Sequence, residues 1–211
     1  MLLDLLRGLG TSLEIFAFTL LIALPLGFPL ALGRMAKNRI LSGVIGVWIS
    51  IVRGTPLMLQ IIFVYFAPYI FFGMPLARYP RILATVLAFG LNYAAYFAEI
   101  YRGGMLAVDP GQREAAKSLG LSRGQTFFRI VLPQTIKRVI PAVGNEVITL
   151  VKDTSLAFTI AVTEMFTIAK QLASANTTMT PLIAAAVFYY IFNYIVAFVM
   201  ARIEKRYAYY A

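Results

Sequence analysis

The chain has 211 residues, of which 60% are hydrophobic and only 13% are charged, and its mean hydropathy is +0.79. A soluble domain carries roughly a quarter charged residues, so this composition excludes a water-soluble globular protein and predicts that lipid surrounds much of the chain. The net charge is +10, and the basic residues lie at the ends of apolar segments, as orientation signals do, which argues against nucleic-acid binding. Cysteine and histidine are absent, which excludes disulfides and removes the commonest general base and metal ligand.

Five stretches of the chain are long and apolar enough to cross a membrane, which requires about 20 residues. They cover residues 11–33, 41–72, 82–101, 139–161 and 182–202. The second stretch is longer than one span requires and is interrupted by Arg53-Gly54-Thr55-Pro56, so we expect its first part to lie along the membrane interface. The chain is therefore predicted to be an all-α polytopic membrane protein whose residues 1–211 form one transmembrane domain.

The basic residues of the connecting segments predict its orientation. With five spans, 13 of the 19 Lys and Arg residues lie on one side of the membrane and four lie on the other side, while Arg53 and Lys152 lie within or near spans. The four are Arg7, Arg78, Arg81 and Lys170. Because cytoplasmic loops carry the excess of Lys and Arg, the N-terminus is predicted to be outside and the C-terminus in the cytoplasm. The segment 103–138 is then cytoplasmic.

Signals for a short helix open the middle of this cytoplasmic segment. Asp109 suits the N-cap and Pro110 the first helical position, while Gln112, three residues after the cap, can complete a capping box. Gly120 suits the left-handed position that ends a helix. These signals predict a helix of about ten residues between Asp109 and Gly120.

A second short helix is predicted to follow directly. Ser122 is its candidate N-cap, with Gln125 three residues later, and we expect it to stop near Leu132, because Pro133 follows. The two helices would be joined by a tight turn at residues 120–121. One face of this pair carries Ala115, Leu119 and Leu121. A compact element of this kind suits insertion into a groove on a partner.

The spacing of residues in this pair carries a resemblance to a known family. Glu114-Ala115-Ala116, then Gly120, then Ile130 and Leu132-Pro133 resemble the EAA loop of ABC importer permeases at its full spacing. In that family the loop, here residues 103–135, forms a coupling helix that docks into a cleft of an ATPase subunit. The coupling residues implied by the resemblance are Glu114, Ala115, Ala116, Ser118, Leu119, Gly120 and Leu121.

Further blocks are similar to the polar amino acid branch of the same superfamily. They are Arg53-Gly54-Thr55-Pro56-Leu57, Ala98-Glu99-Ile100-Tyr101-Arg102-Gly103-Gly104, Val108-Asp109-Pro110-Gly111-Gln112, Pro141-Ala142-Val143-Gly144-Asn145-Glu146 and Lys152-Asp153-Thr154-Ser155-Leu156. One departure is Ala157-Phe158-Thr159, where Val-Ser-Val is more usual.

The resemblance implies a type I importer permease subunit with five spans, in the cytoplasmic membrane of a prokaryote. The implied partners are a pair of ABC ATPase subunits, a second permease subunit that is either a copy or a paralogue, and an extracytoplasmic amino-acid-binding protein. The sequence holds no Gly-x-x-x-x-Gly-Lys-Ser/Thr loop. We therefore expect a transport subunit without catalytic residues, metal or cofactor, whose partner ATPase binds ATP and Mg.

Two of the predicted spans carry polar stripes, and charged groups in spans usually face a cavity or a partner. At 100° per residue, one stripe covers an arc of about 120°. Its residues are Asn145, Glu146, Thr149, Lys152 and Asp153. The other stripe consists of Thr85, Asn92, Tyr96, Glu99 and Gly103. Together the stripes predict a polar pathway through the helix bundle.

An amino acid substrate needs acceptors for its ammonium group and donors for its carboxylate. The candidate acceptors are Asp153 and Glu146, and the candidate donors are Thr154, Ser155, Lys152 and Thr55, with Asn92 on the neighbouring stripe. Pro25, Pro29 and the Gly54–Pro56 interruption are expected to expose free backbone groups to a cavity.

Structural roles compete with binding for several of these residues. Glu99 can pair with Arg102, Asn92 can bond between helices, and Glu146 and Lys152 can form salt bridges with neighbours. Arg53 can extend to the interface from a helix end.

Two other function classes compete with the importer subunit. A secondary carrier or channel would use Glu146 and Asp153 as ion sites, but the chain lacks the inverted repeat of such carriers. An intramembrane enzyme would need these two carboxylates as an acid pair, and seven residues on one helix separate them by about 10 Å. The sequence leaves the substrate open among Arg, Lys, His, Gln, Glu and cystine.

Overall fold

The computed structural model describes residues 1–76 and 79–208 and confirms the all-α prediction, since these residues contain helices and no strand. The α-helices are α1 (Leu2–Arg34), α2 (Arg39–Gly54), α3 (Leu57–Phe72), α4 (Arg81–Leu106), α5 (Pro110–Ser118), α6 (Arg123–Thr126), α7 (Leu132–Asp153), α8 (Met165–Asn176) and α9 (Thr180–Ala208). A π-helical segment, η2 (Phe127–Val131), precedes α7, and a 3-10 helix, η3 (Thr154–Ile160), follows it. Arg78 lies outside the described residues.

The arrangement of the long helices agrees with about five spans. In the described part of the chain α1, α4 and α9 are long and apolar enough to cross a membrane on their own. Two bent pairs of helices raise the total to five, if each pair is one span. The α2–α3 pair bends by 111° at the predicted interruption, and the helix that runs to Ile160 bends by 58° before α8.

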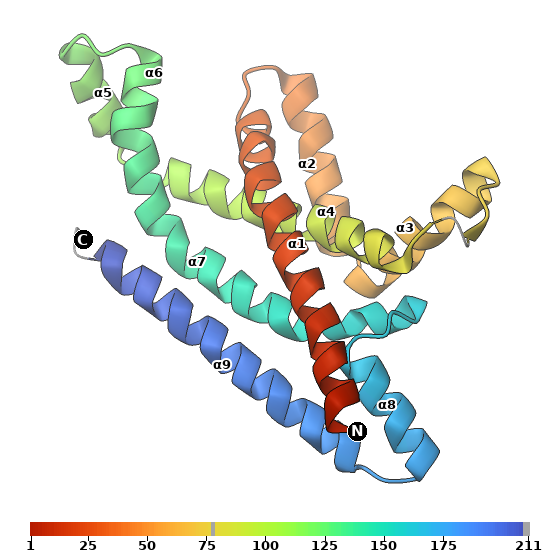
Figure 1. Cartoon of the computed structure of the whole chain (residues 1–211). Coiled ribbons are helices and arrows are strands. Elements are labelled where there is room, and N and C mark those ends of the chain that lie inside the picture. The colour runs from red at the N-terminus through yellow and green to blue at the C-terminus, as the bar shows by residue number, and fades with distance from the viewer. Residues whose placement is uncertain (77–78, 209–211) are drawn as a thin grey trace.

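Helix α4 is the centre of the packing, and α1 crosses it closely (Figure 1). A Cβ atom built on Gly27 of α1 would lie 2.8 Å from the Cβ of Phe97, so only glycine permits this approach. Along α4, Phe89, Tyr93, Phe97 and Tyr101 recur every four residues, and neighbouring ring centroids are 6.2 to 6.4 Å apart. This column of rings fills the core between α1, α3 and α7.

The prolines of the first span do not break it. Helix α1 is continuous through Pro25 and Pro29, and both rings lie on its exposed side. The interruption at Gly54–Pro56 does separate two helices, because Pro56 ends the run of backbone donors and Thr55 adopts an extended conformation. The predicted break is therefore confirmed in the second span, whereas α1 stays helical and each of its prolines removes only one backbone donor.

Two helical features differ from the sequence-based prediction. The second cytoplasmic helix was expected to stop at Leu132, but it continues through η2 into α7, and this prediction is wrong. The wider π turn gives the Pro133 ring room that an α turn denies it. The predicted spans also leave out α8, which has only 12 residues and carries Lys170, so neither its length nor its composition resembles a span.

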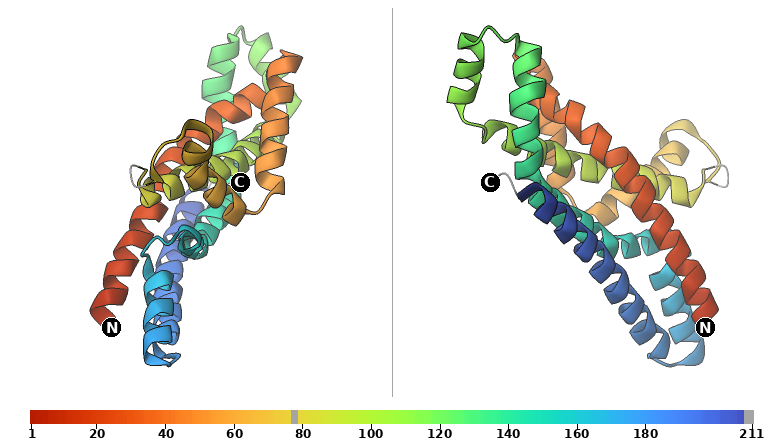
Figure 2. Two further views of the ribbon diagram at one scale, coloured as in Figure 1. Left: turned by 90° about the vertical axis from the view of Figure 1, so that its right-hand side faces the viewer. Right: turned by 60° about the vertical axis from the view of Figure 1, so that its left-hand side comes forward.

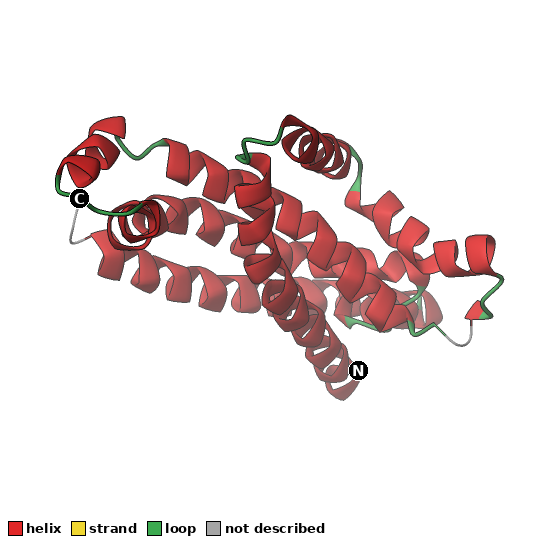
Figure 3. Ribbon diagram, turned by 90° about the horizontal axis from the view of Figure 1, so that it is seen from above, coloured by secondary structure: helices red, strands yellow, loops and turns green. Residues whose placement is uncertain are grey.

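The ends of the helices gather on two sides of the molecule. The N-terminus of α1 lies beside α8 and the start of α9, while the other end of α1 lies toward α2 and the α5–α6 pair (Figures 1 and 2). Seen from above, the described chain is an elongated assembly of helices joined by short loops (Figure 3). The fold thus separates the α5–α6 pair from the α8–α9 turn.

Candidate functional site

The first candidate site is the α5–α6 hairpin, residues 107–126. Its first helix has the predicted N-cap and the predicted glycine after its last turn, but the capping box expected with Gln112 does not form. The Asp109 carboxylate caps α5 by accepting from the Gly111 N–H at 2.7 Å. At the other end Gly120 has φ +74°, and its N–H donates to the Lys117 carbonyl at 3.0 Å. The next N–H, of Leu121, donates to the Ala116 carbonyl at 3.0 Å. These two bonds form a Schellman motif, which needs glycine at the left-handed position.

The second helix of the hairpin begins with the predicted capping box. The Gln125 N–H donates to the Ser122 hydroxyl oxygen at 3.3 Å, and the Gln125 side-chain oxygen accepts from the Ser122 N–H at 2.8 Å. Both helix ends at the turn are therefore closed by bonds between residues at most five apart in sequence. The hairpin is defined by its own local chemistry.

Most of the predicted coupling residues lie on the outside of this hairpin. Ala116 alone is buried against the rest of the chain, with 1% of its surface exposed, and Leu121 is half-buried. Leu119 is 79% exposed, so its side chain is available to a partner. The other exposed coupling residues are Glu114, Ala115, Ser118 and Gly120. The hairpin thus presents a small apolar knob with a charged rim.

The second candidate site lies where the α2–α3 break meets α4. The Gln60 side-chain amide donates to the Val52 carbonyl at 2.7 Å, the Thr55 carbonyl at 3.1 Å and the Thr55 hydroxyl at 2.9 Å. Its carbonyl oxygen accepts from the side-chain amide of Asn92, which is 5% exposed, at 3.0 Å. This confirms that Asn92 bonds between helices. Gln60, which is not among the predicted site residues, holds the break against α4.

The end of α7 supplies another part of this site. Asp153 is half-buried, and its Oδ2 accepts from the Tyr93 hydroxyl of α4 at 2.8 Å. The Thr154 hydroxyl is fully buried and donates to the Val151 carbonyl at 2.8 Å, while the Ser155 hydroxyl donates to the Lys152 carbonyl at 2.8 Å. Of these neighbouring candidates, Asp153 and half-buried Ser155 retain exposed surface, whereas Thr154 does not.

Glu146 and Asp153 lie seven residues apart on α7, and both are half-buried. Glu146 interacts electrostatically with Asp153 and with Arg53 from the end of α2, whose guanidinium carbon lies 5.0 Å from the Tyr96 ring centroid. Within the described residues neither Glu146 nor exposed Lys152 forms an ion pair, so the predicted salt bridges are absent there. The polar cluster of this second site therefore consists of Arg53, Gln60, Asn92, Tyr93, Tyr96, Glu146 and Asp153.

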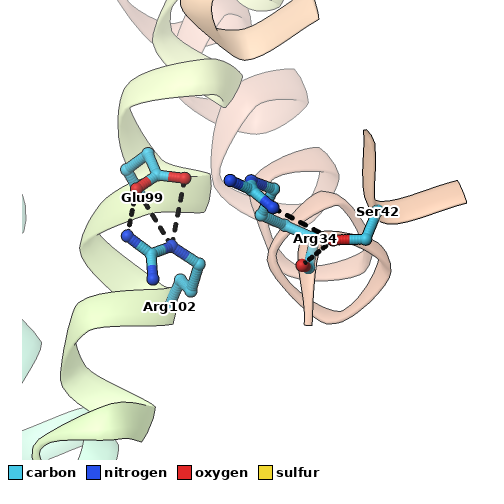
Figure 4. Close-up of polar contacts among 4 residues, drawn as sticks. All are labelled: Arg34, Ser42, Glu99 and Arg102. Atoms are coloured by element: carbon cyan, nitrogen blue, oxygen red, sulfur yellow. Dashed lines mark hydrogen bonds and ion pairs between the residues drawn. The ribbon is translucent and has the colours of Figure 1, made fainter. Parts of the chain in front are cut away.

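Glu99 has the structural role that the sequence analysis weighed against binding. Its carboxylate forms an ion pair with Arg102 in which three N–H···O bonds measure 2.7 to 3.1 Å (Figure 4). Beside this pair the Arg34 guanidinium donates to the Ser42 hydroxyl at 3.0 Å, and that hydroxyl donates to the Arg34 carbonyl at 2.6 Å (Figure 4). The first pair is confined to α4, and the second closes the turn between α1 and α2.

A buried carboxylate that the sequence analysis missed lies at the start of α8. Glu164 is fully buried and accepts from the N–H groups of Phe166 and Thr167, each at 2.7 Å. The hydroxyls of Thr167 and Tyr189 donate to it at 2.8 and 2.9 Å. All its bonds are made within the chain, so it anchors α8 to α9. Across the described residues no cluster of three acidic, cysteine or histidine side chains could hold a metal ion.

This set of apolar spans, a polar cluster between helices and an exposed coupling-type hairpin defines a transport component rather than an enzyme. Residues 23–209 match the family described as "Binding-protein-dependent transport system inner membrane component". The chain belongs to this family.

Curated relatives cover most of the chain. It is 38% identical over 206 residues to the nopaline transport system permease protein NocM of Agrobacterium fabrum, covering 94% of this chain and 84% of the relative. It is 35% identical over 203 residues to the arginine transport system permease protein ArtQ of Bacillus subtilis, and the match covers 96% of this chain and 91% of the relative. A solved structure of an amino acid ABC transporter with histidines superposes with a TM-score of 0.87 and 31% identity, covering 96% of this chain and 94% of that one.

Proposed function

We propose that this chain is the permease subunit of an ATP-driven importer for a polar amino acid, with residues 1–211 as one permease domain. The observation that carries the proposal is the closed α5–α6 hairpin, which presents Leu119 on its tip while its own caps hold it rigid. A rigid apolar knob suits a groove on an ATPase subunit. The ATPase pair would bind ATP and Mg, and the loop 103–135 would transmit its closure to the spans.

The polar cluster supports the assignment of a pathway for an amino acid. Glu146 and Asp153 offer acceptors for an ammonium group, and Arg53 offers donors for a carboxylate. Lys152, Ser155 and Thr55 also keep exposed or half-buried positions near the cluster. Thr154 and Asn92, which are buried and bonded within the chain, are better suited to holding the walls of the pathway.

The exposed polar side of α7 supports a second permease subunit. Asn145, Thr149 and Lys152 are exposed on a helix that belongs to the apolar part of the chain. Polar groups that face lipid are costly, and this face gains if a copy or a paralogue of the chain covers it and encloses a water-filled pathway. An extracytoplasmic amino-acid-binding protein would deliver substrate at the side of the α8–α9 turn.

The orientation within the prokaryotic cytoplasmic membrane follows the distribution of basic residues. The α1–α2 turn, the hairpin and the end of α9 carry the excess of Lys and Arg, while the N-terminus and α8 lie on the opposite side. The C-terminus and the hairpin would then be cytoplasmic, where ATP is available, and the N-terminus would be outside.

Coupled ATP hydrolysis tests this function. The full chain would be reconstituted in lipid with the ATPase and binding protein from its gene neighbourhood, and hydrolysis measured against a panel of polar amino acids. We expect one of them to stimulate hydrolysis. Leu119→Asp and Glu114→Lys should abolish this stimulation, because they alter the exposed knob without touching the core. Ile40→Asp is the matched control, since Ile40 is 78% exposed on the same side but outside the hairpin.

If the amino acid stimulates ATP hydrolysis to the same extent in Leu119→Asp as in Ile40→Asp, the hairpin does not couple the ATPase to transport. Transport by the chain alone, without an ATPase, would support the secondary carrier in which Glu146 and Asp153 serve as ion sites.

A further inference from the structure

A cavity of about 610 Å³ lies between the α5–α6 hairpin and the neighbouring ends of α1 and α4. It lies behind the hairpin and is lined by its inner face, whereas the exposed Leu119 that would meet an ATPase is not among the lining residues. Of the coupling residues named above only Leu121 lines the cavity, so the exposed face that would meet an ATPase leaves the cavity free.

The floor of this cavity is apolar. It is formed by Leu32 and Met35 from the end of α1, Met105 from the end of α4, and Phe127 and Val131 from η2. Helix α1 has 33 residues and is therefore about 50 Å long, more than the roughly 30 Å of the hydrocarbon core. The helix therefore extends beyond the hydrocarbon core, and Arg34, Lys37 and Arg39 at or just after its last turn are typical of a helix end at the cytoplasmic membrane surface, in the orientation proposed above. The floor is accessible at this end, since Leu32 is 41% exposed.

The rim of the cavity is cationic. Arg113 and Lys117 of α5 and Arg123 of α6 all line it, and all three are exposed. The Arg113 guanidinium donates to the Met105 carbonyl at 3.1 Å, which fixes one positive charge at the mouth of the apolar floor. Among the described residues none of the three forms an ion pair. The rim therefore holds three positive charges that no acidic side chain of the described residues pairs with.

We propose that this cavity binds an anionic phospholipid, with its phosphate on the cationic rim and an acyl chain on the apolar floor. A basic pocket between helices at a membrane surface matches such a lipid in both halves, because each Lys or Arg near the surface favours the anionic headgroup. Free phosphate would satisfy the rim and leave the floor exposed to water. The bound lipid would tie the inner face of the hairpin to α1 and α4.

Quenching by brominated lipid tests this site in the full chain reconstituted in phosphatidylcholine vesicles. Trp48 is the only tryptophan of the sequence, so Trp48→Phe with Met35→Trp places a single reporter at the cavity. Quenching by a minor fraction of dibromo-phosphatidylglycerol would be compared with quenching by the same fraction of dibromo-phosphatidylcholine. The natural Trp48, which lies outside the cavity lining, reports general contact with the bilayer.

We expect about a tenfold preference for the anionic lipid at the cavity reporter and little preference at Trp48. Lys117→Glu with Arg123→Glu should remove the preference, and Lys117→Gln with Arg123→Gln should reduce it. Lys37→Glu with Arg39→Glu changes the net charge equally at the α1–α2 turn and should retain it.

Equal quenching by the two lipids at the cavity, or an equal loss in the Lys37 and Arg39 control, would overturn the proposal. Displacement of the preference by inorganic phosphate would also overturn it and assign the rim to free phosphate. The measurement needs no ATPase, so its failure is separate from a failure of the coupling function.

Discussion

The α5–α6 hairpin and the polar cluster around α4 are held together in different ways. In the hairpin the caps at Asp109, Gly120 and Ser122 use bonds between residues two to five apart in sequence. In the cluster the Gln60–Asn92 bond joins residues 32 apart, and the Tyr93–Asp153 bond joins residues 60 apart. The hairpin can therefore form and dock as a local unit, while the cluster exists only when α2, α3, α4 and α7 have packed.

This difference separates two kinds of mutational effect. A change in the cluster should lower the stability of the whole chain, because its bonds connect spans. A change in the hairpin caps should loosen the hairpin alone and leave the spans folded.

The largest expected effect belongs to Gln60→Leu. It leaves the buried Asn92 amide and the Val52 carbonyl without their partner, and a loss of about 3 kcal/mol is expected for such unpaired groups. The measurement is the thermal unfolding midpoint of the chain in detergent, which should fall strongly.

Gln171→Leu is the matched control, because Gln171 is exposed on α8. The double variant Gln60→Leu with Asn92→Leu should recover part of the loss, since both polar partners are then removed. A similar unfolding midpoint for Gln60→Leu and Gln171→Leu would show that the Gln60 contacts do not stabilise the α2–α3 break.

A smaller effect is expected for Tyr93→Phe. This change removes one hydroxyl bond to the Asp153 carboxylate at a site where Tyr93 is 2% exposed, which costs about 1.5 kcal/mol. The unfolding midpoint should fall moderately. The apparent affinity for the transported amino acid should fall too, because Asp153 loses the bond that orients it. Tyr69→Phe, at an exposed tyrosine of α3, should change neither quantity.

The smallest effect is expected for Gly120→Ala, and it should be confined to the hairpin. Alanine at φ +74° costs about 1 kcal/mol, although a Cβ there meets no atom within 4 Å. Hydrogen exchange of the hairpin amides should accelerate about fivefold, with the unfolding midpoint unchanged. Gly124→Ala, in the same hairpin at an ordinary helical position, should slow exchange instead. Equal acceleration in both variants would contradict the role assigned to the Gly120 conformation.

The hairpin could be predicted because capping residues act on their own neighbourhood. Asp109, Gly120, Ser122 and Gln125 were all assigned from the sequence, and each has the expected position. Only some of the candidate binding residues are accessible in the polar cluster. A helical stripe shows which residues share a face, but it does not show what lies opposite that face. Thus Asp153 meets Tyr93, whereas Thr154 turns into the core.

Composition and local pattern by themselves determined the class of the chain, its apolar spans and the caps at the turn of the α5–α6 hairpin, because hydropathy and capping depend on nearby residues. Only the tertiary structure decided that Gln60 holds the α2–α3 break, that α8 exists as an additional helix and that Arg113, Lys117 and Arg123 surround an apolar cavity. These features depend on side chains that approach from separate helices, and a linear pattern does not contain the distances between helices.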